Sequence, residues 1–532
     1  TFSVWVKRGN FGSYQVMLYG GNPAGSTAES IRFDNDEDLR IGQASSAYDL
    51  KTDQKFRDIG AWYHIVVAFD TDNGTSGDRI KVYVNNDRVT GFSTETYPSS
   101  GYSTNFTANS SSVEHVLGAN SSSGPASQFF DGYMAEINFI DGQALTPASF
   151  GETNTDGVWV PKEYSGSYGN NGFFIDGRDS SDLGDDESGN GNDFASSGLA
   201  AADQVKDTPT KNWCVWNNID TSFNDNTTSD GNLKITTASP GYTRFQLGTF
   251  GVTSGKWEWK WTPTDSLSDG GIGVDDGTSQ AATGASSGAF SSQSANGVIY
   301  RSGGTKLVGG TASSYGASFA ADDVIRVQLN LDAATKTIEF FKNDSSQGTI
   351  NLNDNVTYFP AQFSADAGLV TVADFGQSGF SAAAGFNLLN TSNLATPTIS
   401  DGSKYFQATL YNGTGSELEV DQSGNSTFQP DFVWIKNRSN AGNEHDLYDA
   451  VRGATKAIFA SAANAESTQT QGLKSFDSDG FTVGTRGEVN TSGSTNVAWQ
   501  WLAGNTTGST NDDGSVDSTV TVNTTAGFSI CK

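Results

Sequence analysis

The sequence predicts an all-β protein built from tandem antiparallel β-sandwiches. In the segment 61–86, apolar residues alternate on both sides of a polar loop made of Asp, Asn, Gly and Ser. The segment 324–344 repeats this design. Period-two spacing around a glycine-bearing turn is typical of an antiparallel pair with one face in a core. The 62 glycines among 532 residues also indicate many turns between short strands.

Length, charge and cysteine content limit the classes of function. A chain of 532 residues is too long for one core, and about three or four domains are expected. The net charge of −29 would repel a phosphate backbone, so we expect no nucleic-acid partner. No segment approaches the roughly 18 apolar residues of a membrane span, so no membrane insertion is expected. Cys214 and Cys531 provide neither a disulfide framework nor a zinc-binding spacing.

Residues 1–150 are expected to form the first sandwich. Besides the hairpin, we predict strands at 2–7, 15–19, 30–33, 39–41, 114–117 and 132–139. The strings WYHIVVAFD, IKVYVNN, HVLGAN and FFDGYMAEINFIDGQALTPASFG occur in this order and resemble the laminin-G/concanavalin-A-like jelly-roll family. The resemblance implies a sandwich that often binds glycans or calcium at a loop rim. That family has an opening strand before TFSVWVKRG, and we expect this strand to be missing here.

Residues 151–212 are expected to be a connector rich in Gly and Asp. Its DESGNG string matches the first half of an EF-hand loop, although the twelfth position is Ser197 where a bidentate Glu is required. Several carboxylates near this string could form an irregular calcium site. The candidate ligands are Asp182, Asp185, Asp186, Asn190 and Asp193. The competing interpretation is a solvated turn rich in Asp and Asn.

The calcium hypothesis predicts a thermal effect. If these residues bind calcium, excess chelator should lower the melting temperature, because a ligand that binds only the folded state stabilises it. Thermal melting with chelator, and again after calcium is restored, measures the effect. A melting curve that does not change with chelator would remove calcium from the description of this segment.

Residues 213–385 are expected to form the second sandwich. They contain, in order, GVTSGKWEWKW, GIGV, ADDVIRVQLNLDAATKTIEFFKND and VTVADFGQ. This succession resembles the SPRY domain family, and the resemblance implies a binding module that presents loops at one end and catalyses nothing. Trp257, Trp259 and Trp261 alternate along one predicted strand, so we expect them in the core.

Residues 386–532 are expected to form a smaller, mostly-β domain. Leu447, Val451 and Ile458 suggest one short helix within it. The closing string STVTVNTTAGFSICK resembles KYFQATLYNGTG in placement, so we expect a second repeat to begin there and to be truncated at the C-terminus.

The order of these parts resembles large structural proteins of marine bacteriophages, those of phages infecting cyanobacteria above all. The resemblance implies a tail fibre, a tail-tip appendage or a head decoration on the virion surface. Its expected partners are a host cell-surface glycan or protein and other virion proteins. A homo-oligomer is implied as well, most often a trimer.

The sequence offers no clear enzymatic motif. Glu-x-Asp-x-x-Glu, Gly-x-x-x-x-Gly-Lys-[Ser/Thr] and His-Glu-x-x-His are absent, and no Gly-x-Ser-x-Gly string lies at an expected strand-to-helix turn. His64 falls inside a strand pattern, where we expect a packed side chain. We therefore expect a non-enzymatic protein with no catalytic residue. A secreted or cell-surface adhesin with the same modules and a polysaccharide depolymerase are the alternatives.

Overall fold

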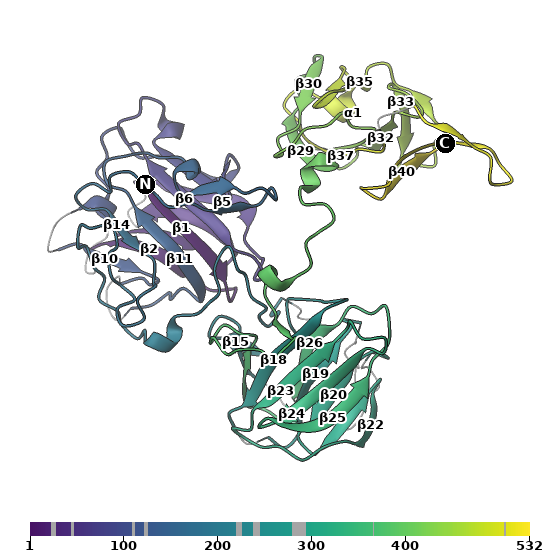
Figure 1. Cartoon of the computed structure of the whole chain (residues 1–532). Coiled ribbons are helices and arrows are strands. Elements are labelled where there is room, and N and C mark those ends of the chain that lie inside the picture. Colours follow the sequence, from purple (N-terminus) through teal and green to yellow (C-terminus); the bar gives the residue numbers. More distant parts are fainter. Residues whose placement is uncertain are drawn as a thin grey trace. The chain divides into compact units, whose positions relative to one another are not determined.

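The computed structural model describes all residues except 23–27, 44–46, 109–111, 122–125, 220–225, 238–244, 266, 279–293, 365 and 505–506. The chain divides into two compact units. Unit 1 comprises Thr1–Glu152 and Trp159–Leu394, and unit 2 comprises Thr153–Val158 and Ala395–Lys532. Strands dominate both units (Figure 1), which confirms the all-β prediction of tandem antiparallel sandwiches.

Helical structure is sparse in the described part of the chain. It contains one α-helix, α1 (Gly487–Asn490), and none of its helices is long and apolar enough to cross a membrane. Short 3-10 turns are η1 (Ser76–Asp78), η2 (Asn105–Thr107), η3 (Pro147–Ser149), η4 (Ala201–Asp203), η6 (Thr391–Asn393) and η7 (Gly402–Lys404).

The first sandwich consists of two six-stranded sheets. One has the order β14 (Phe173–Ile175), β11 (Gly132–Phe139), β1 (Phe2–Arg8), β6 (Tyr63–Phe69), β7 (Ile80–Val84) and β8 (Asp87–Arg88). The other has the order β10 (Glu114–Leu117), β2 (Gln15–Gly21), β3 (Glu29–Phe33), β4 (Asp38–Gln43), β5 (Asp49–Lys55) and β9 (Phe92–Thr96). The predicted hairpin is β6 and β7, in which Val67 lies opposite Val82 and both are buried.

Part of the segment expected as a connector belongs to this sandwich. Strand β14 extends the first sheet by pairing with β11, and the Phe173 ring stacks on Phe139 with centroids 5.5 Å apart. Phe194 packs against Phe173 at 4.8 Å. The same segment forms a two-stranded hairpin of β12 (Gly151–Thr153) and β13 (Trp159–Pro161).

The first sheet is covered on both faces. Val4 and Val6 of β1 point into the sandwich core, while Trp5 lies in a second cluster with Trp62, Tyr133 and the second sandwich's Val215. Such double burial explains why every residue of β1 is buried.

A buried charge joins the two sandwiches of unit 1. The Lys7 ammonium donates to Asp207 Oδ2 at 2.9 Å, to Asn212 Oδ1 at 2.6 Å and to the Trp213 carbonyl at 2.9 Å. Trp62 Nε1 donates to the other Asp207 oxygen at 3.0 Å. The side chains of Lys7 and Asp207 are fully buried, so all three ammonium protons are used inside the interface.

The second sandwich pairs an eight-stranded sheet with a six-stranded sheet. The larger has the order β15 (Thr227–Ser229), β16 (Lys234–Thr236), β27 (Val370–Asp374), β18 (Lys256–Pro263), β23 (Ile325–Asn330), β24 (Thr337–Lys342) and β25 (Ser345–Asn351), with β28 (Asn387–Leu388) beside β18. The smaller has the order β17 (Phe245–Leu247), β26 (Phe359–Ser364), β19 (Gly270–Asp275), β20 (Val298–Arg301), β21 (Thr305–Val308) and β22 (Thr311–Ser314).

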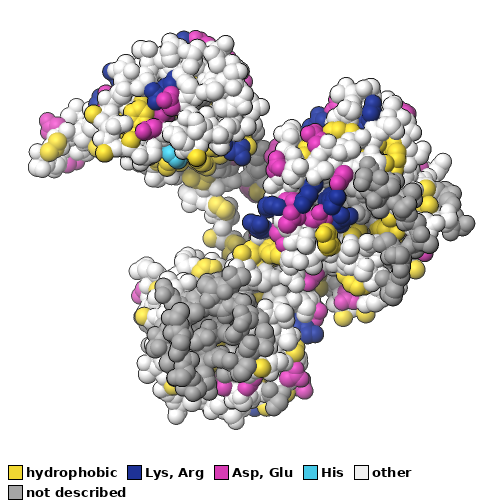
Figure 2. Space-filling view, turned by 180° about the vertical axis from the view of Figure 1, so that it is seen from behind, with side chains coloured by type: hydrophobic (Ala, Val, Ile, Leu, Met, Phe, Trp, Pro, Cys, Tyr) yellow, Lys and Arg dark blue, Asp and Glu magenta, His cyan; other side chains and the backbone are white. Residues whose placement is uncertain are grey.

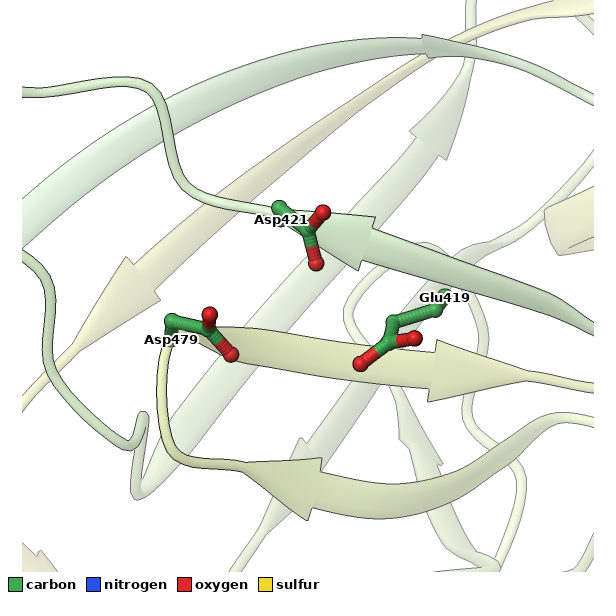
Figure 3. A group of neighbouring side chains, drawn as sticks. All are labelled: Glu419, Asp421 and Asp479. Atoms are coloured by element: carbon green, nitrogen blue, oxygen red, sulfur yellow. The ribbon is translucent and has the colours of Figure 1, made fainter.

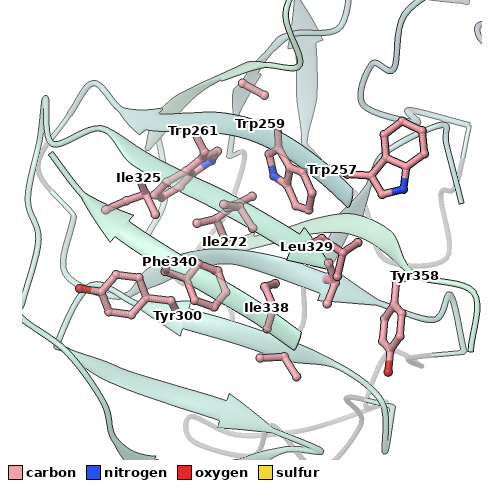
Figure 4. Close-up of a cluster of buried hydrophobic side chains, with 14 of the residues drawn as sticks. Trp257, Trp259, Trp261, Ile272, Tyr300, Ile325, Leu329, Ile338, Phe340 and Tyr358 are labelled. Atoms are coloured by element: carbon pink, nitrogen blue, oxygen red, sulfur yellow. The ribbon is translucent and has the colours of Figure 1, made fainter. Parts of the chain in front are cut away.

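The core of the second sandwich is organised around three tryptophans. Trp257, Trp259 and Trp261 lie along β18 among aliphatic and aromatic side chains (Figure 4), and each is at most 3 % exposed, which confirms the prediction. Opposite them, β19 contains the GIGV string. A Cβ on Gly273 would lie 1.9 Å from the Val298 carbonyl oxygen, so the close approach of β20 requires glycine there.

Unit 2 contains one six-stranded sheet and two three-stranded sheets. The large sheet has the order β29 (Phe406–Asn412), β37 (Thr495–Trp501), β31 (Phe432–Asn437), β32 (His445–Asp449), β33 (Lys456–Phe459) and β34 (Ser467–Thr468). The others are β30 (Leu418–Asp421), β36 (Gly480–Val483) and β35 (Leu473–Asp477), and β38 (Ser509–Asn511), β39 (Ser518–Asn523) and β40 (Phe528–Cys531).

The helix predicted through Leu447, Val451 and Ile458 is wrong. Leu447 lies on β32 and Ile458 on β33, where the two residues are direct cross-strand partners. Val451 occupies the turn between the strands, and Gly453 follows it with a φ of 94°. A positive φ at that position ends any helical path, so the spacing of the apolar residues reflects a hairpin.

Candidate functional site

The large sheet of unit 2 has one face in the core and one face open. Val433, Ile435 and Ala498 point into the core and are fully buried. The alternate residues lie on the opposite face, where β-strand periodicity places them side by side across the strands. We call this surface the aromatic face and define it by Phe406, Phe432, Trp434, Leu447, Ile458, Trp499 and Trp501.

The register aligns the aromatic face in rows. Trp434 lies beside Trp499 on one side and Leu447 on the other, and the two indole centroids are 5.4 Å apart with their planes at 64°. In the neighbouring row, Trp501 contacts Phe406 and Phe432 with centroids 4.9 Å and 5.3 Å away. This geometry fixes the rings against each other while leaving them partly exposed to solvent.

One end of the aromatic face is covered and the other is open. Phe528 of β40 stacks on Trp501 at 5.7 Å, which covers the row of Trp501 and Phe432. Trp434 and Trp499 are half-buried, and Figure 2 shows hydrophobic side chains exposed beside the histidine of the C-terminal unit, which is His445. The open end is therefore the part of the face that a ligand can reach.

Polar groups border the open end. Trp434 Nε1 donates to His445 Nδ1 at 2.9 Å. An indole nitrogen can only donate, so Nδ1 of His445 must accept, and a neutral ring then presents Nε2–H as a donor. Lys436 lies in the next row and holds the following loop through the Asn443 carbonyl at 2.6 Å.

A shallow cavity of about 380 Å³ lies between the loop that follows β31 and residues 487–494. Amide and hydroxyl side chains make up most of its lining. Its lining includes Asn437, Ser439, Asn440, Asn443, Glu488 and Thr491. Half-exposed indole rings bind the apolar faces of sugars or apolar side chains, and amides and hydroxyls pair with hydroxyl groups. The aromatic face offers the first kind of contact and the cavity offers the second, and both lie in unit 2.

Sequence reasoning did not find the aromatic face. The string DFVWIKNRS reads as a buried strand, because both of its faces carry apolar residues. The available signal was Lys436, which shares a face with Trp434 and indicates that this side of the strand reaches solvent.

Both carboxylate oxygens of the predicted calcium ligand Asp186 accept hydrogen bonds from the protein itself. Its Oδ1 accepts from the Phe174 and Ser188 amides, and its Oδ2 accepts from the Asn192 amide and the Ser188 hydroxyl, all within 2.9 Å. Burial alone would raise the pKa of Asp186, but these donors outweigh burial and lower it. Asp186 therefore organises the turn, as the competing interpretation expects.

The other predicted ligands lie around the same loop. Asp182 and Asp193 line a hollow of about 460 Å³, and Asn190 Nδ2 donates to the Gly169 and Gly172 carbonyls. Desolvation and the nearby negative charges of Asp193 and Asp182 raise the pKa of Asp185. No three of these carboxylates bring their oxygens within 4.8 Å of one another. Calcium binding by this loop stays a prediction.

A different acidic cluster was not predicted. Within the described residues, Glu419, Asp421 and Asp479 form the one group whose carboxylate oxygens all lie within 4.8 Å (Figure 3). Glu419 and Asp421 alternate on β30, and Asp479 precedes β36, where Asp421 lies opposite Gly480. The alternating acids of the string ELEVD were the available signal.

His64 is a packed histidine, as predicted. It is fully buried and stacks on Trp5 with centroids 4.6 Å apart. Trp159 Nε1 donates to its Nδ1 at 3.0 Å, so Nε2 carries the hydrogen and the Ser3 hydroxyl, 2.9 Å away, accepts it. This proton arrangement is the reverse of a histidine that activates a serine. Burial lowers the pKa of His64 to about 3.

The acidic string DNDEDLR lies in a neutralised network on the first sandwich. Asp38 pairs with Lys55 at 2.6 Å and with Lys51 at 3.1 Å. Arg40 binds Asp49 with two contacts of 2.7 Å. Figure 2 shows basic and acidic side chains intermixed on this sandwich. Because the charges are paired within the protein, this surface has little net charge to attract a charged partner.

Comparison with known proteins supports part of this description. Residues 1–149 match the concanavalin A-like lectin/glucanases superfamily, in agreement with the predicted laminin-G/concanavalin-A-like sandwich. Residues 401–532 match a domain of unknown function, DUF7483, which includes the aromatic face. No curated protein sequence matches the chain.

Among solved structures, the chain is similar to a human SPRY domain, with 13 % identity, a TM-score of 0.23, and coverage of 30 % of this chain and 98 % of that one. The SPRY domain of human HERC1 shows 19 % identity, a TM-score of 0.22, and coverage of 30 % and 96 %. Stonustoxin shows 15 % identity, a TM-score of 0.23, and coverage of 30 % of this chain and 26 % of that one.

Proposed function

We propose that this protein is a non-enzymatic recognition protein of a virion surface that binds a host cell-surface glycan through the aromatic face. The observation that carries the proposal is the half-exposed pair Trp434 and Trp499, held 5.4 Å apart in the same unit as a cavity lined by amides and hydroxyls. A binding role for glycans or proteins is supported by the concanavalin A-like first sandwich.

The physical argument favours sugar over a purely apolar ligand. Pyranose rings present C–H groups that pack on indole faces, and their hydroxyls need donors and acceptors at the rim of the contact. His445 Nε2 and the side chains of Asn440 and Asn443 lie on the segment that follows Trp434 and can supply such groups. A uniformly apolar partner would leave these groups without partners.

The placement on a virion rests on the resemblance of the module order to marine bacteriophage structural proteins. A particle surface presents many copies of a protein, so weak glycan contacts add through multivalency. Rigid sandwiches suit this role because they hold a binding surface at a fixed orientation. The proposal includes other virion proteins as partners and a homo-oligomeric assembly.

The binding prediction concerns Trp434 and Trp499. Replacing either with alanine should weaken binding about tenfold, because a lost ring contact removes about 1.5 kcal/mol. Affinity of the full chain for a panel of immobilised bacterial and algal polysaccharides measures the effect. Phe129→Ala is the control, since Phe129 is a 62 % exposed aromatic residue of unit 1 and is not part of the aromatic face.

Two outcomes would contradict the proposal. Wild-type binding that both tryptophan variants retain would place glycan recognition elsewhere. New reducing ends released from any polysaccharide of the panel would show that the protein is an enzyme. Melting curves of each variant establish that a loss of binding is not a loss of folding.

A further inference from the structure

Strand β29 is an open edge of the large sheet in unit 2 (Figure 1). It pairs on one side only, with β37, and the Tyr405 carbonyl accepts from the Leu502 amide at 2.9 Å. Backbone groups alternate in direction along an antiparallel strand, so the odd-numbered residues bond to β37. The residues whose N–H and C=O groups point away from β37 are Phe406, Ala408, Leu410 and Asn412.

This edge lacks the features that protect several other edges of the described sheets. Natural proteins protect an edge with charges, prolines, bulges or short strands. In the described strands, β8 has two residues and both are charged, β9 carries Glu95, and β30 carries Glu419 and Asp421. Strand β25 is polar and its pairing contains a register shift. Strand β29 has seven residues, FQATLYN, with no charge, no proline and no shift in its register.

Three of the four exposed side chains of β29 are apolar, namely Phe406, Ala408 and Leu410, and the fourth is Asn412. Phe406 is 41 % exposed and Leu410 is 65 % exposed, and both lie on the face that carries the tryptophans. The aromatic face therefore continues to the edge of the sheet instead of ending in polar residues. An apolar surface beside unpaired backbone groups favours the addition of another strand.

We propose that β29 of one chain pairs with β29 of a second copy, antiparallel, about a two-fold axis at Thr409. In this register Ala408 lies opposite Leu410 and Phe406 opposite Asn412, so small or polar residues face large ones. Every outward backbone group of the edge gains a partner, because even-numbered residues then face even-numbered residues. A register centred one residue away leaves an end unpaired.

The pairing has a consequence for the recognition surface. Opposite residues of an antiparallel pair share one face, so the aromatic faces of the two copies lie on the same side of a single continuous sheet. The contact is isologous and closed, which limits the assembly to two copies at this edge. It specifies the homo-oligomeric contact of the proposed function and is independent of which ligand the aromatic face binds.

Sedimentation equilibrium of the full chain over a range of concentrations tests the pairing. The wild-type protein should reach twice the mass of one chain. Leu410→Lys places a charge at the centre of the contact, and Ala408→Pro removes an outward N–H without touching the β37 ladder. Each variant should raise the dimer dissociation constant at least about tenfold. Val522→Lys is the control, since Val522 is 53 % exposed on β39 and should leave the dimer intact.

A wild-type mass of one chain at every concentration, or of three chains, would overturn the pairing. A dimer that both Leu410→Lys and Ala408→Pro retain would also overturn it. Polysaccharide binding per chain, measured on the same variants, separates this contact from the proposed function: loss of the dimer with unchanged affinity per chain is the expected result. A wild-type protein that forms the dimer but binds no polysaccharide of the panel would contradict the proposed glycan site and leave the pairing intact.

Discussion

Replacing Asp207 with alanine should destabilise unit 1 by about 3–5 kcal/mol, because it leaves the ammonium of Lys7 buried without a counter-charge. The two side chains are fully buried and 2.9 Å apart. The substitution also removes the acceptor of Trp62 Nε1. Urea unfolding followed by tryptophan fluorescence measures the loss, since Trp62 and Trp213 both lie at this interface.

A second variant separates charge from packing. Asp207→Leu combined with Lys7→Met replaces the ion pair by apolar side chains, and such replacements of buried pairs are often neutral. The double variant should therefore recover at least about half of the loss seen in Asp207→Leu alone. Losses that simply add in the double variant would mean that the two charges do not stabilise each other. The exposed residue Asp156 provides a surface control as Asp156→Ala.

Acidification from pH 6.5 to pH 3 should remove about 4 kcal/mol of stability through His64 alone. Burial lowers the pKa of His64 from 6.5 to about 3. Between these values the unfolded chain binds a proton that the folded chain does not, so stability falls as the pH falls. Above about pH 7.5 both states are neutral at this ring, and the full contribution is present.

The measurement is the difference between wild type and a variant that cannot titrate at this position. His64→Gln keeps one acceptor and one donor but loses the ring that stacks on Trp5, so the variant should be less stable at pH 7. Because glutamine does not titrate, the variant should lose less stability than the wild type on acidification. His115→Gln is the matched control, because His115 is only half-buried and one of its ring nitrogens contacts the Asn105 carbonyl. Equal acid slopes in wild type and His64→Gln would show that His64 is not the titrating group.

The sequence predicted the strands that carry several apolar residues and missed strands that are short or rich in charged residues. The hairpin of β6 and β7 was found because its apolar residues alternate. Strand β5 was missed because DLKTDQK carries Lys51 and Lys55, which pair with acids on the solvent side. Strand β14 was missed because three residues in a glycine-rich segment give no periodicity, and only its pairing with β11 makes it a strand.

The aromatic face could not be predicted for a different reason. Trp434 and Trp499 are far apart in the sequence, and only the register of β31 against β37 places them together. Local periodicity gives the face on which a side chain lies but not its neighbour across the strands. The predicted calcium ligands show the opposite limit, because local sequence reveals a cluster but not its bonding. Asp182 and Asp193 were visible as a cluster in the sequence. The structure shows that Asp186 between them accepts hydrogen bonds from backbone amides.

The Lys7 interface also constrains how the protein is made. Lys7 and Asp207 are 200 residues apart, and the ribosome adds about 5–20 residues per second. Strand β1 therefore leaves the ribosome about 10–40 s before the residues that cover its outer face. Until those residues emerge, Trp5 and Lys7 of β1 lack the partners that cover them in the folded protein. Synthesis of unit 1 thus includes a period in which a chaperone or a neighbouring nascent chain can reach these two residues.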